Sequence, residues 1–419
     1  MLVYVLDING HPLMPTKRFG KVRRMLRDGR AKVVSREPFT IKLLYETKTN
    51  VVQECTLGID TGSKYIGAAV VSNGKVLYAS EVKIKDDIKS KMDRRRSYRR
   101  NRRNRKTRYR KARILNRGNS TKKGRYSPTL KSKFDSHIRE IEFIKSILPV
   151  KDIVLEVGQF DTHKLKNPNV RGWGYQKGVN YGFASSREHA LCRDKYTCQV
   201  CKAKNTKLEV HHIKYRSRGG TDDLDNLITL CADCHKKVHA EKLNINKKPK
   251  KLPDFSSATT MSILRSMLLK RYPEAIETFG FITKENRLSL NLPKEHFIDA
   301  CIIASGGEEF VLPNDVFIKR HVTRGDYQAT KGVRSEKRLP NSKILGFRKW
   351  DKVTYMGQEY FIKGRRTSGT CELEDIHGNK IDFSYMSRGF KTPKLSNCKR
   401  ISARNTTLCQ KIEYIPKVS

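Results

Sequence analysis

Apolar and polar positions alternate in two groups near the start of the chain, and each group predicts a small β-sheet. The first group has strands at residues 2–8, 31–34 and 39–44 around a helix at 17–28. Thr16 is a suitable N-cap for that helix, and Gly29 is a suitable residue to end it. The second group is a three-strand meander at residues 51–60, 65–71 and 75–79, with an Asn-Gly pair suited to its hairpin turn.

The middle of the chain has the apolar spacing of helices and of one buried strand. Apolar residues recur at helical spacing from 134 to 148, where a proline follows. The run at 152–156 predicts a buried strand that ends on Glu156. Residues 293–304 predict another helix, on which a spacing of three puts His296 and Asp299 on one face.

From about residue 344, short alternating runs are interrupted by glycines. The runs lie at 352–355, 359–362 and 371–376. Short strands separated by turn residues are typical of all-β domains. This region therefore predicts a small β-barrel.

The charge of the chain indicates its partner. The 419 residues include 88 Lys and Arg against 42 Asp and Glu, a formal net charge of +46. This excess goes well beyond what solubility requires, and nucleic acid is its natural counter-ion. No long apolar run suggests a membrane span, and the first residues read as a strand and not as a signal peptide. Ten cysteines fit a reducing compartment, so we expect a cytoplasmic protein.

The densest basic segment lies at residues 94–113, where 13 of 20 positions are Lys or Arg and none is acidic. Arginine has good helix propensity, and a helix this polar needs a polyanion to cover it. A solvated or disordered basic segment is the alternative. The candidate nucleic-acid contacts are Arg94, Arg95, Arg96, Arg99, Arg100, Arg102, Arg103, Arg105, Arg108, Arg110 and Arg113.

Two Cys-x2-Cys pairs predict a zinc site in the middle of the chain. The pairs are Cys198 with Cys201 and Cys231 with Cys234. Four thiolates at such spacings suit tetrahedral Zn²⁺. A structural zinc ribbon without any catalytic role would have the same four cysteines.

The histidines around these pairs distinguish a nuclease from a simple ribbon. His211 and His212 lie between the pairs, so that one imidazole can bind a divalent ion while the other takes a proton from water. His235 and His239 share a helix face and can complete the ligand set. Asn226 is expected to hold the intervening loop through hydrogen bonds to the backbone. The combination predicts an HNH nuclease.

A second cluster of candidate residues comes from distant parts of the chain. Asp60 ends the first strand of the meander, Glu156 ends the buried strand, and Asp299 lies on the helix at 293–304. If they converge at one sheet edge, three carboxylates can hold two Mg²⁺ ions against a phosphodiester. His296 could orient the nucleophile or act as its base. Ordinary surface carboxylates are the alternative.

These residues resemble those of the IscB proteins, transposon-associated RNA-guided DNA nucleases related to the Cas effectors that carry HNH and RuvC nucleases. The resemblance rests on the segments 11–15 (His-Pro-Leu-Met-Pro) and 58–62 (Gly-Ile-Asp-Thr-Gly), the arginine run, Leu155-Glu156, the HNH segment, and His296 to Ala300. It extends over nearly the whole chain.

The resemblance implies a multi-domain α/β protein with an RNase H-like RuvC core split into three segments. A ββα-metal HNH module with a four-cysteine zinc site is inserted in that core. A small α+β domain precedes the core, and a β-rich C-terminal domain follows it. The implied parts are an N-terminal domain at 1–50, RuvC segments at 51–85, 119–180 and 246–320, a bridge helix at 86–118, the HNH domain at 181–245, and a domain for a target-adjacent motif at 321–419.

The resemblance also implies the roles of the residues and the partners. Asp60, Glu156, Asp299 and His296 would form the RuvC site with Mg²⁺. In the HNH site, His212 would be the base beside Asn226, and the ligands of Mg²⁺ would be His211, His235 and His239. A monomeric protein would bind a structured guide RNA that pairs with one strand of double-stranded DNA. HNH would cut that strand and RuvC the displaced one. An RNA-independent HNH endonuclease and a nuclease-inactive RNA-binding protein remain alternatives.

Overall fold

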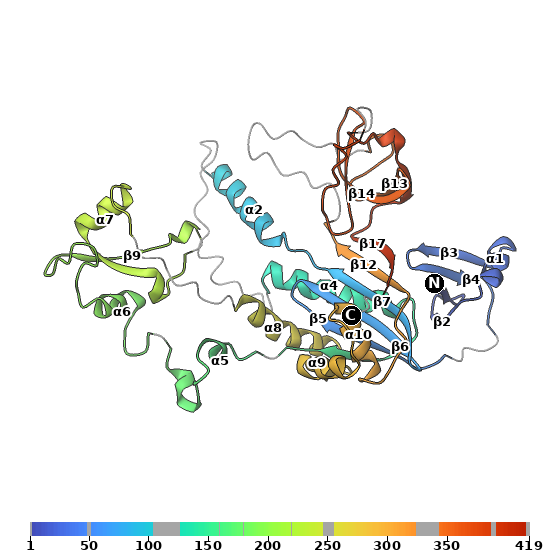
Figure 1. Cartoon of the computed structure of the whole chain (residues 1–419), viewed down its shortest axis with the longest axis horizontal. Helices are drawn as coiled ribbons and strands as arrows, with labels where there is room; N and C mark the ends of the chain where they lie inside the picture. Colours follow the sequence, from blue (N-terminus) through green and yellow to red (C-terminus); the bar gives the residue numbers. More distant parts are fainter. Residues whose placement is uncertain are drawn as a thin grey trace. The chain divides into compact units, whose positions relative to one another are not determined.

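The structure is a computed structural model of the chain and describes residues 2–47, 52–103, 126–158, 160–178, 180–218, 220–245, 255–323, 343–386 and 391–415. The chain forms two compact units, in which Met1–Gln159 and Thr260–Ser419 make the first and Phe160–Thr259 the second. Figure 1 labels many of the elements of both units. The segment predicted as the HNH domain lies entirely within the second unit. Among the described residues, none of the helices combines the length and the apolar character that a membrane crossing requires.

The N-terminal sheet has the strands that the apolar pattern predicts and one strand that it does not. Its elements are β1 (Val3–Leu6), β2 (Pro12–Thr16), α1 (Phe19–Arg27), β3 (Ala31–Arg36) and β4 (Phe39–Leu43), with the strand order β2-β1-β4-β3. Strand β2 contains two prolines, which explains why it was not predicted and why it lies at a sheet edge. Thr16 does not cap α1, whose N-cap is Arg18, but Gly29 has φ +68° and follows the helix end as predicted.

The largest sheet has seven strands in the order β11-β8-β5-β6-β7-β12-β17. Its strands are β5 (Cys55–Thr61), β6 (Tyr65–Ser72), β7 (Lys75–Lys83), β8 (Val150–Glu156), β11 (Ile276–Thr278), β12 (Asp315–His321) and β17 (Thr407–Glu413). The predicted meander is confirmed, because β5, β6 and β7 pair in antiparallel fashion. Strand β8 runs parallel to β5, β11 runs parallel to β8, and β12 runs parallel to β7.

Helices cover both faces of this sheet, and the central strands β5 and β6 are accordingly buried at nearly every position instead of alternately. Helices α4 (Pro128–Lys145) and α8 (Ser256–Arg271) share a core with Leu57, Ile59 and Ala68. Helix α10 (His296–Ser305) packs with Ala69 and its neighbours on the other face. Helix α9 (Gly280–Ser289) precedes α10 in the chain.

Two glycines let α10 lie directly on the sheet. A Cβ added at Gly58 would be 2.3 Å from the carbonyl oxygen of Ala300, and one at Gly67 would be 1.9 Å from that of His296. Neither position tolerates a side chain without movement of the helix. The close approach brings the start of α10 next to the end of β5.

The C-terminal part forms a four-stranded antiparallel sheet in the order β15-β14-β13-β16. The strands are β13 (Lys352–Tyr355), β14 (Gln358–Arg365), β15 (Cys371–Glu374) and β16 (Lys399–Ser402). The β-rich prediction is confirmed, but β15 and β16 lie at opposite edges. The described strands therefore make an open sheet and not the predicted barrel, because the periodicity of strands does not determine closure.

The basic segment begins as helix α2 (Ile88–Arg103). Its arginines Arg94, Arg95, Arg96 and Arg100 are exposed and Arg99 is half-buried, while Arg102 and Arg103 lie in its last turn. The remaining predicted contacts, Arg105, Arg108, Arg110 and Arg113, lie outside the described residues.

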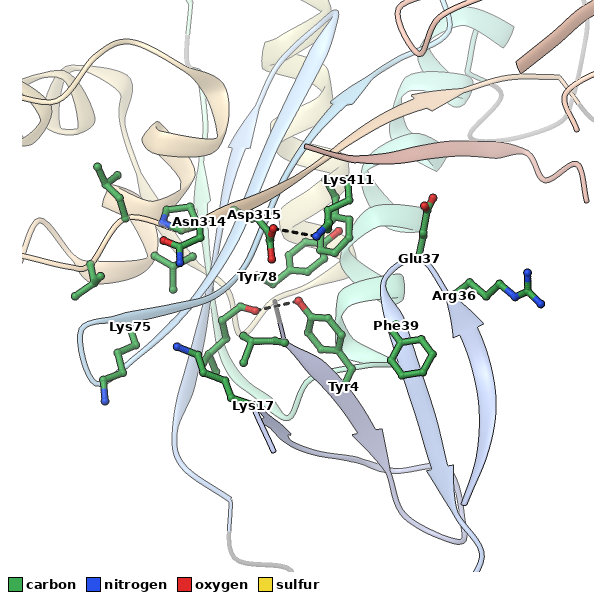
Figure 2. A pocket seen from close by; sticks show the side chains of 18 residues that line it. Tyr4, Lys17, Arg36, Glu37, Phe39, Lys75, Tyr78, Asn314, Asp315 and Lys411 are labelled. Carbon is green, nitrogen blue, oxygen red and sulfur yellow. Dashed lines mark hydrogen bonds and ion pairs between the residues drawn. The ribbon is translucent and has the colours of Figure 1, made fainter. Parts of the chain in front are cut away.

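A cavity of about 350 Å³ lies between the N-terminal sheet and the seven-stranded sheet (Figure 2). The Tyr4 hydroxyl donates to the carbonyl of Leu77 at 3.0 Å, and the Lys411 ammonium donates to Asp315 at 3.1 Å. None of the predicted catalytic or metal-binding residues lines this cavity.

Candidate metal and nuclease sites

The four predicted zinc ligands come together in the second unit. The Sγ atoms of Cys198, Cys201, Cys231 and Cys234 all lie within 4.8 Å of one another. Cys231 ends strand β10 (Leu227–Cys231), and its sulfur accepts a hydrogen bond from the backbone N–H of Cys234 at 3.5 Å, at the start of α7 (Ala232–His239). Four thiol ligands at this spacing match the donor set of structural zinc. Cys192, six residues before Cys198, is exposed.

Three of the predicted histidines form a second group, the three-histidine cluster. One ring nitrogen each of His211, His235 and His239 lies within 4.8 Å of the other two. His211 is on strand β9 (Leu208–His212), which pairs with β10, and the other two lie one turn apart on α7. Burial, followed by the charges of His235 and His239, lowers the pKa of His211 to about 4. Its imidazole is therefore neutral near pH 7, as a metal ligand must be.

The side chain of His212 has a different partner, because successive residues of a strand point to opposite faces. Its Nε2 lies 2.7 Å from Oδ1 of Asp222. Arg216 contacts the same carboxylate oxygen at 2.5 Å and 2.9 Å. The hydrogen bonds from His212 and Arg216 lower the pKa of Asp222, which is thus ionised and can only accept.

Asn226 holds the loop between β9 and β10, as predicted. Its Oδ1 accepts from the backbone N–H of Lys214 at 2.8 Å, and its Nδ2 donates to the carbonyls of Lys214 and Thr221 at 3.1 Å and 2.7 Å. The side chain is buried. These three bonds fix the loop that leads from His212 to Asp222.

Two acidic residues of this unit were not predicted as part of the site. Glu209 contacts Nδ1 of His235 at 2.5 Å, and Asp222 contacts His212. Glu209 lies two residues before His211, on the same strand face, so period-two spacing could have revealed it. Asp222 lies in a loop, and no periodic signal marks it.

The four residues predicted at the edge of the seven-stranded sheet also lie near one another; we call them the sheet-edge site. Asp60 and Glu156 are register neighbours at the ends of β5 and β8. Nδ1 of His296 lies 2.6 Å from Oδ2 of Asp60. Asp299, one turn further along α10, is buried and accepts a hydrogen bond from Arg287 at 2.7 Å.

The electrostatics of the sheet-edge site show that its carboxylates interact. Burial, followed by the charge of Asp60, raises the pKa of Glu156 to about 7. The hydrogen bond with Asp60 raises the pKa of His296. Burial raises the pKa of Asp299, although Arg287 acts in the opposite direction. A cation at this edge would relieve the repulsion between the carboxylates.

The sheet-edge site is looser than the two clusters of the second unit. Within the described parts of the chain, the groups with three or more ligand atoms inside 4.8 Å are the cysteine and histidine clusters. Arg287, which was not predicted, occupies one oxygen of Asp299. Its position depends on how α9 packs on α10, which the local sequence does not reveal.

Comparison with known families matches two parts of the chain. Residues 3–178 match the RRXRR protein family, and residues 198–241 match the HNH endonuclease family. The second match covers both metal-ligand clusters, so the chain contains an HNH endonuclease domain.

Two characterised proteins share short segments with the chain. Anaredoxin from Nostoc sp. is 42% identical over 53 residues, which is 13% of this chain and 70% of that protein. The type IV methyl-directed restriction enzyme EcoKMcrA from Escherichia coli is 47% identical over 38 residues, which is 9% of this chain and 14% of the enzyme. The HNH family match and the similarity to EcoKMcrA support a nuclease.

Proposed function

Because the chain belongs to the IscB family, whose architecture joins an RRXRR region to an HNH module, we propose that it is an RNA-guided, metal-dependent DNA endonuclease. The observation that carries the proposal is the ββα arrangement of the second unit, with a three-histidine cluster on one face of β9 and His212 on the other. A purely structural zinc ribbon would not need these histidines.

In the HNH module, His211, His235 and His239 would hold one divalent ion. Bound there, the ion would stabilise negative charge on the phosphate. Three imidazole nitrogens suit a transition-metal ion better than the Mg²⁺ that the family resemblance implies. Glu209 orients His235 through its contact with Nδ1, in the manner of the carboxylates that support metal-bound imidazoles.

His212 is the proposed general base of the HNH module. Because Asp222 is ionised and can only accept, Nε2 of His212 must carry the hydrogen of their 2.7 Å bond. The lone pair is then on Nδ1, where it can take a proton from water. Arg216 and the loop held by Asn226 keep Asp222 in place.

A second cleavage site of the RuvC type is proposed at the sheet edge. The strand order supports it, since three antiparallel strands are followed by two parallel strands on the side of the first, as in RNase H-like domains. Asp60, Glu156 and Asp299 offer the oxygen ligands that Mg²⁺ prefers. His296, held by Asp60, is positioned to orient a water molecule.

The guide RNA is proposed on the basis of charge and family. A net charge of +46 and an exposed arginine helix suit the backbone of a long nucleic acid. The similarity to EcoKMcrA favours an RNA-independent restriction-type nuclease as the second candidate. That candidate leaves the RRXRR region and the arginine helix without a role.

The test of the two nuclease sites is plasmid cleavage by purified complexes. His212→Ala and Asp60→Ala should each convert double-strand cutting into nicking of one strand, and the double variant should leave the plasmid supercoiled. Labelling each strand separately identifies which site cuts which strand. If the double variant still cuts both strands, neither residue belongs to a nuclease site.

A further inference from the structure

A second cavity of the first unit, the joint cavity, has none of the four sheet-edge residues in its lining. It has a volume of about 250 Å³ and is lined by residues 83–87, 320–323, 350 and 377–378. These residues are the end of β7 with the segment leading into α2, the end of β12, and two loops of the C-terminal sheet. The cavity is far larger than the 10–15 Å³ or so that one water needs. It lies where the arginine helix begins.

Several polar groups that line the joint cavity lack a hydrogen-bond partner among the described residues. They are Nε of Arg320, Nε1 of Trp350, both ring nitrogens of His321 and Oδ1 of Asp87. His321 is only 3% exposed. The Arg320 and Trp350 groups can only donate, and one nitrogen of His321 must also donate. Buried groups of this kind are normally satisfied, so the cavity favours a ligand rich in acceptors.

The charged side chains that line the joint cavity are Lys83, Lys85 and Arg320 against Asp86 and Asp87, a small positive excess that favours an anion. Asp87 is paired with Lys91, and Arg320 is paired with Glu374. Within the described ranges, Lys83 donates only to the carbonyl of His377, at 3.3 Å. Lys85 has no acidic partner at ion-pair distance among the described residues.

The titration of two lining residues agrees with this excess of positive charge. Burial, followed by the positive charges of Arg139 and Lys91, lowers the pKa of Lys85. Burial also lowers the pKa of His321 to about 3. The charge of Glu140 acts against this shift, whereas the cations Arg139, Lys319 and Lys85 act in the same direction as burial. Both groups would be stabilised by an anion between them.

We propose that the joint cavity binds a phosphate group of a nucleic-acid backbone. Phosphate oxygens accept from N–H donors and from ammonium groups, which are the groups present here. A backbone phosphate held at this point would position the nucleic acid that continues along α2, without reading its sequence. The identity of the ligand as nucleic acid rests on the proposed function, whereas the anion site does not.

Trp350 provides a direct readout, because Trp173 is the only other tryptophan in the sequence. Trp173 is 61% exposed and lies in the second unit. In a Trp173→Phe background, the full-length protein, freed of nucleic acid by nuclease and high salt, is titrated with sodium phosphate. Sodium chloride keeps the ionic strength constant. A saturable change in Trp350 emission is expected, and no saturable change would overturn the proposal.

Lys85 variants test whether the response comes from the joint cavity. Lys85→Met should weaken phosphate binding about tenfold, the effect of one charged hydrogen bond, and Lys85→Arg should restore it. Lys21→Met, which removes an exposed lysine of α1, is the matched control and should leave the affinity unchanged. Equal affinities in Lys85→Met and Lys21→Met would contradict the assignment.

The source of the phosphate is tested by competition. Single-stranded RNA and duplex DNA of one sequence are each added to the phosphate-saturated protein. Displacement by RNA would assign the site to the guide, and displacement by duplex DNA would assign it to the target. If neither displaces phosphate, the cavity is an inorganic-anion site only and the inference fails. Plasmid cleavage is measured separately. If the Trp350 response to phosphate is present but no guided cleavage occurs, the proposed function is contradicted and the anion site is not.

Discussion

A single methyl group at Gly67 should separate His296 from Asp60. The added Cβ of Gly67→Ala would lie 1.9 Å from the carbonyl oxygen of His296, whereas an ordinary contact is at least 3.4 Å. The start of α10 must therefore move by about 1.5 Å. A shift of that size away from β5 would lengthen the 2.6 Å bond between His296 and Asp60 beyond hydrogen-bond range.

Two effects of this change can be estimated. Overpacking of this kind costs about 1–3 kcal/mol of stability, more than the roughly 0.4–1 kcal/mol that Gly→Ala can gain from a less flexible unfolded chain. A misplacement of about 1 Å can slow a positioned reaction about 100-fold. We therefore expect both a lower urea midpoint and a loss of cutting at the sheet-edge site.

The assay uses a His212→Ala background, in which any remaining plasmid nicking comes from the sheet-edge site. Gly364→Ala is the matched control, because Gly364 is also a strand glycine and its added Cβ would meet side-chain atoms only at 3.7 Å and 3.9 Å. If Gly67→Ala nicks the plasmid as fast as Gly364→Ala and has the same urea midpoint, the predicted displacement of α10 does not occur. Such a result would mean that α10 does not need its close contact with the sheet.

Three further predictions concern stability and metal content. Lys319→Met should destabilise the protein by about 3–5 kcal/mol in urea, because it removes the cation that pairs with the buried Glu140 at 2.7 Å and leaves that charge to the hydroxyls of Tyr78 and Ser80. Adding Glu140→Gln should restore most of the loss. Burial lowers the pKa of His137 to about 4, so that, as the pH falls, the unfolded chain takes up this proton at a higher pH than the folded protein does. The free energy of unfolding should therefore fall by on the order of 3 kcal/mol between about pH 6.5 and pH 4. His137→Gln should weaken this pH dependence, and an unchanged dependence would show that another group causes it. Cys201→Ser should lose zinc by elemental analysis while the exposed Cys192→Ser retains it, and equal zinc in both would exclude the four-cysteine site.

The HNH part was predictable because its ligands are local in the sequence. Both cysteine pairs and the pair His235 and His239 have spacings that one turn or one helix face brings together, whatever the rest of the chain does. Asn226 also acts through nearby backbone groups, as its residue type suggests. Asp222 was missed because it reaches His212 through a loop whose course is set by hydrogen bonds and not by a period.

The sequence predicts which residues form the sheet-edge site, but not all of the contacts that these residues make. Strand ends at Asp60 and Glu156 follow from apolar runs, and their pairing follows from parallel neighbours in the sheet. The contact of Arg287 with Asp299 depends on the packing of α9 against α10, which no local pattern contains. The same limit explains the open C-terminal sheet where a barrel was expected.

RNA guidance is the central claim, and the most direct measurement of it is programmed cleavage. The protein is co-expressed with its flanking DNA, the RNA that co-purifies is sequenced, and the complex is incubated with plasmids that do or do not carry the match to that RNA. We expect a discrete RNA and metal-dependent cutting of the matched plasmid, which follows the guide when its sequence is changed. Heterogeneous RNA, with cutting that ignores the guide, would rule out RNA guidance and leave an RNA-independent HNH nuclease.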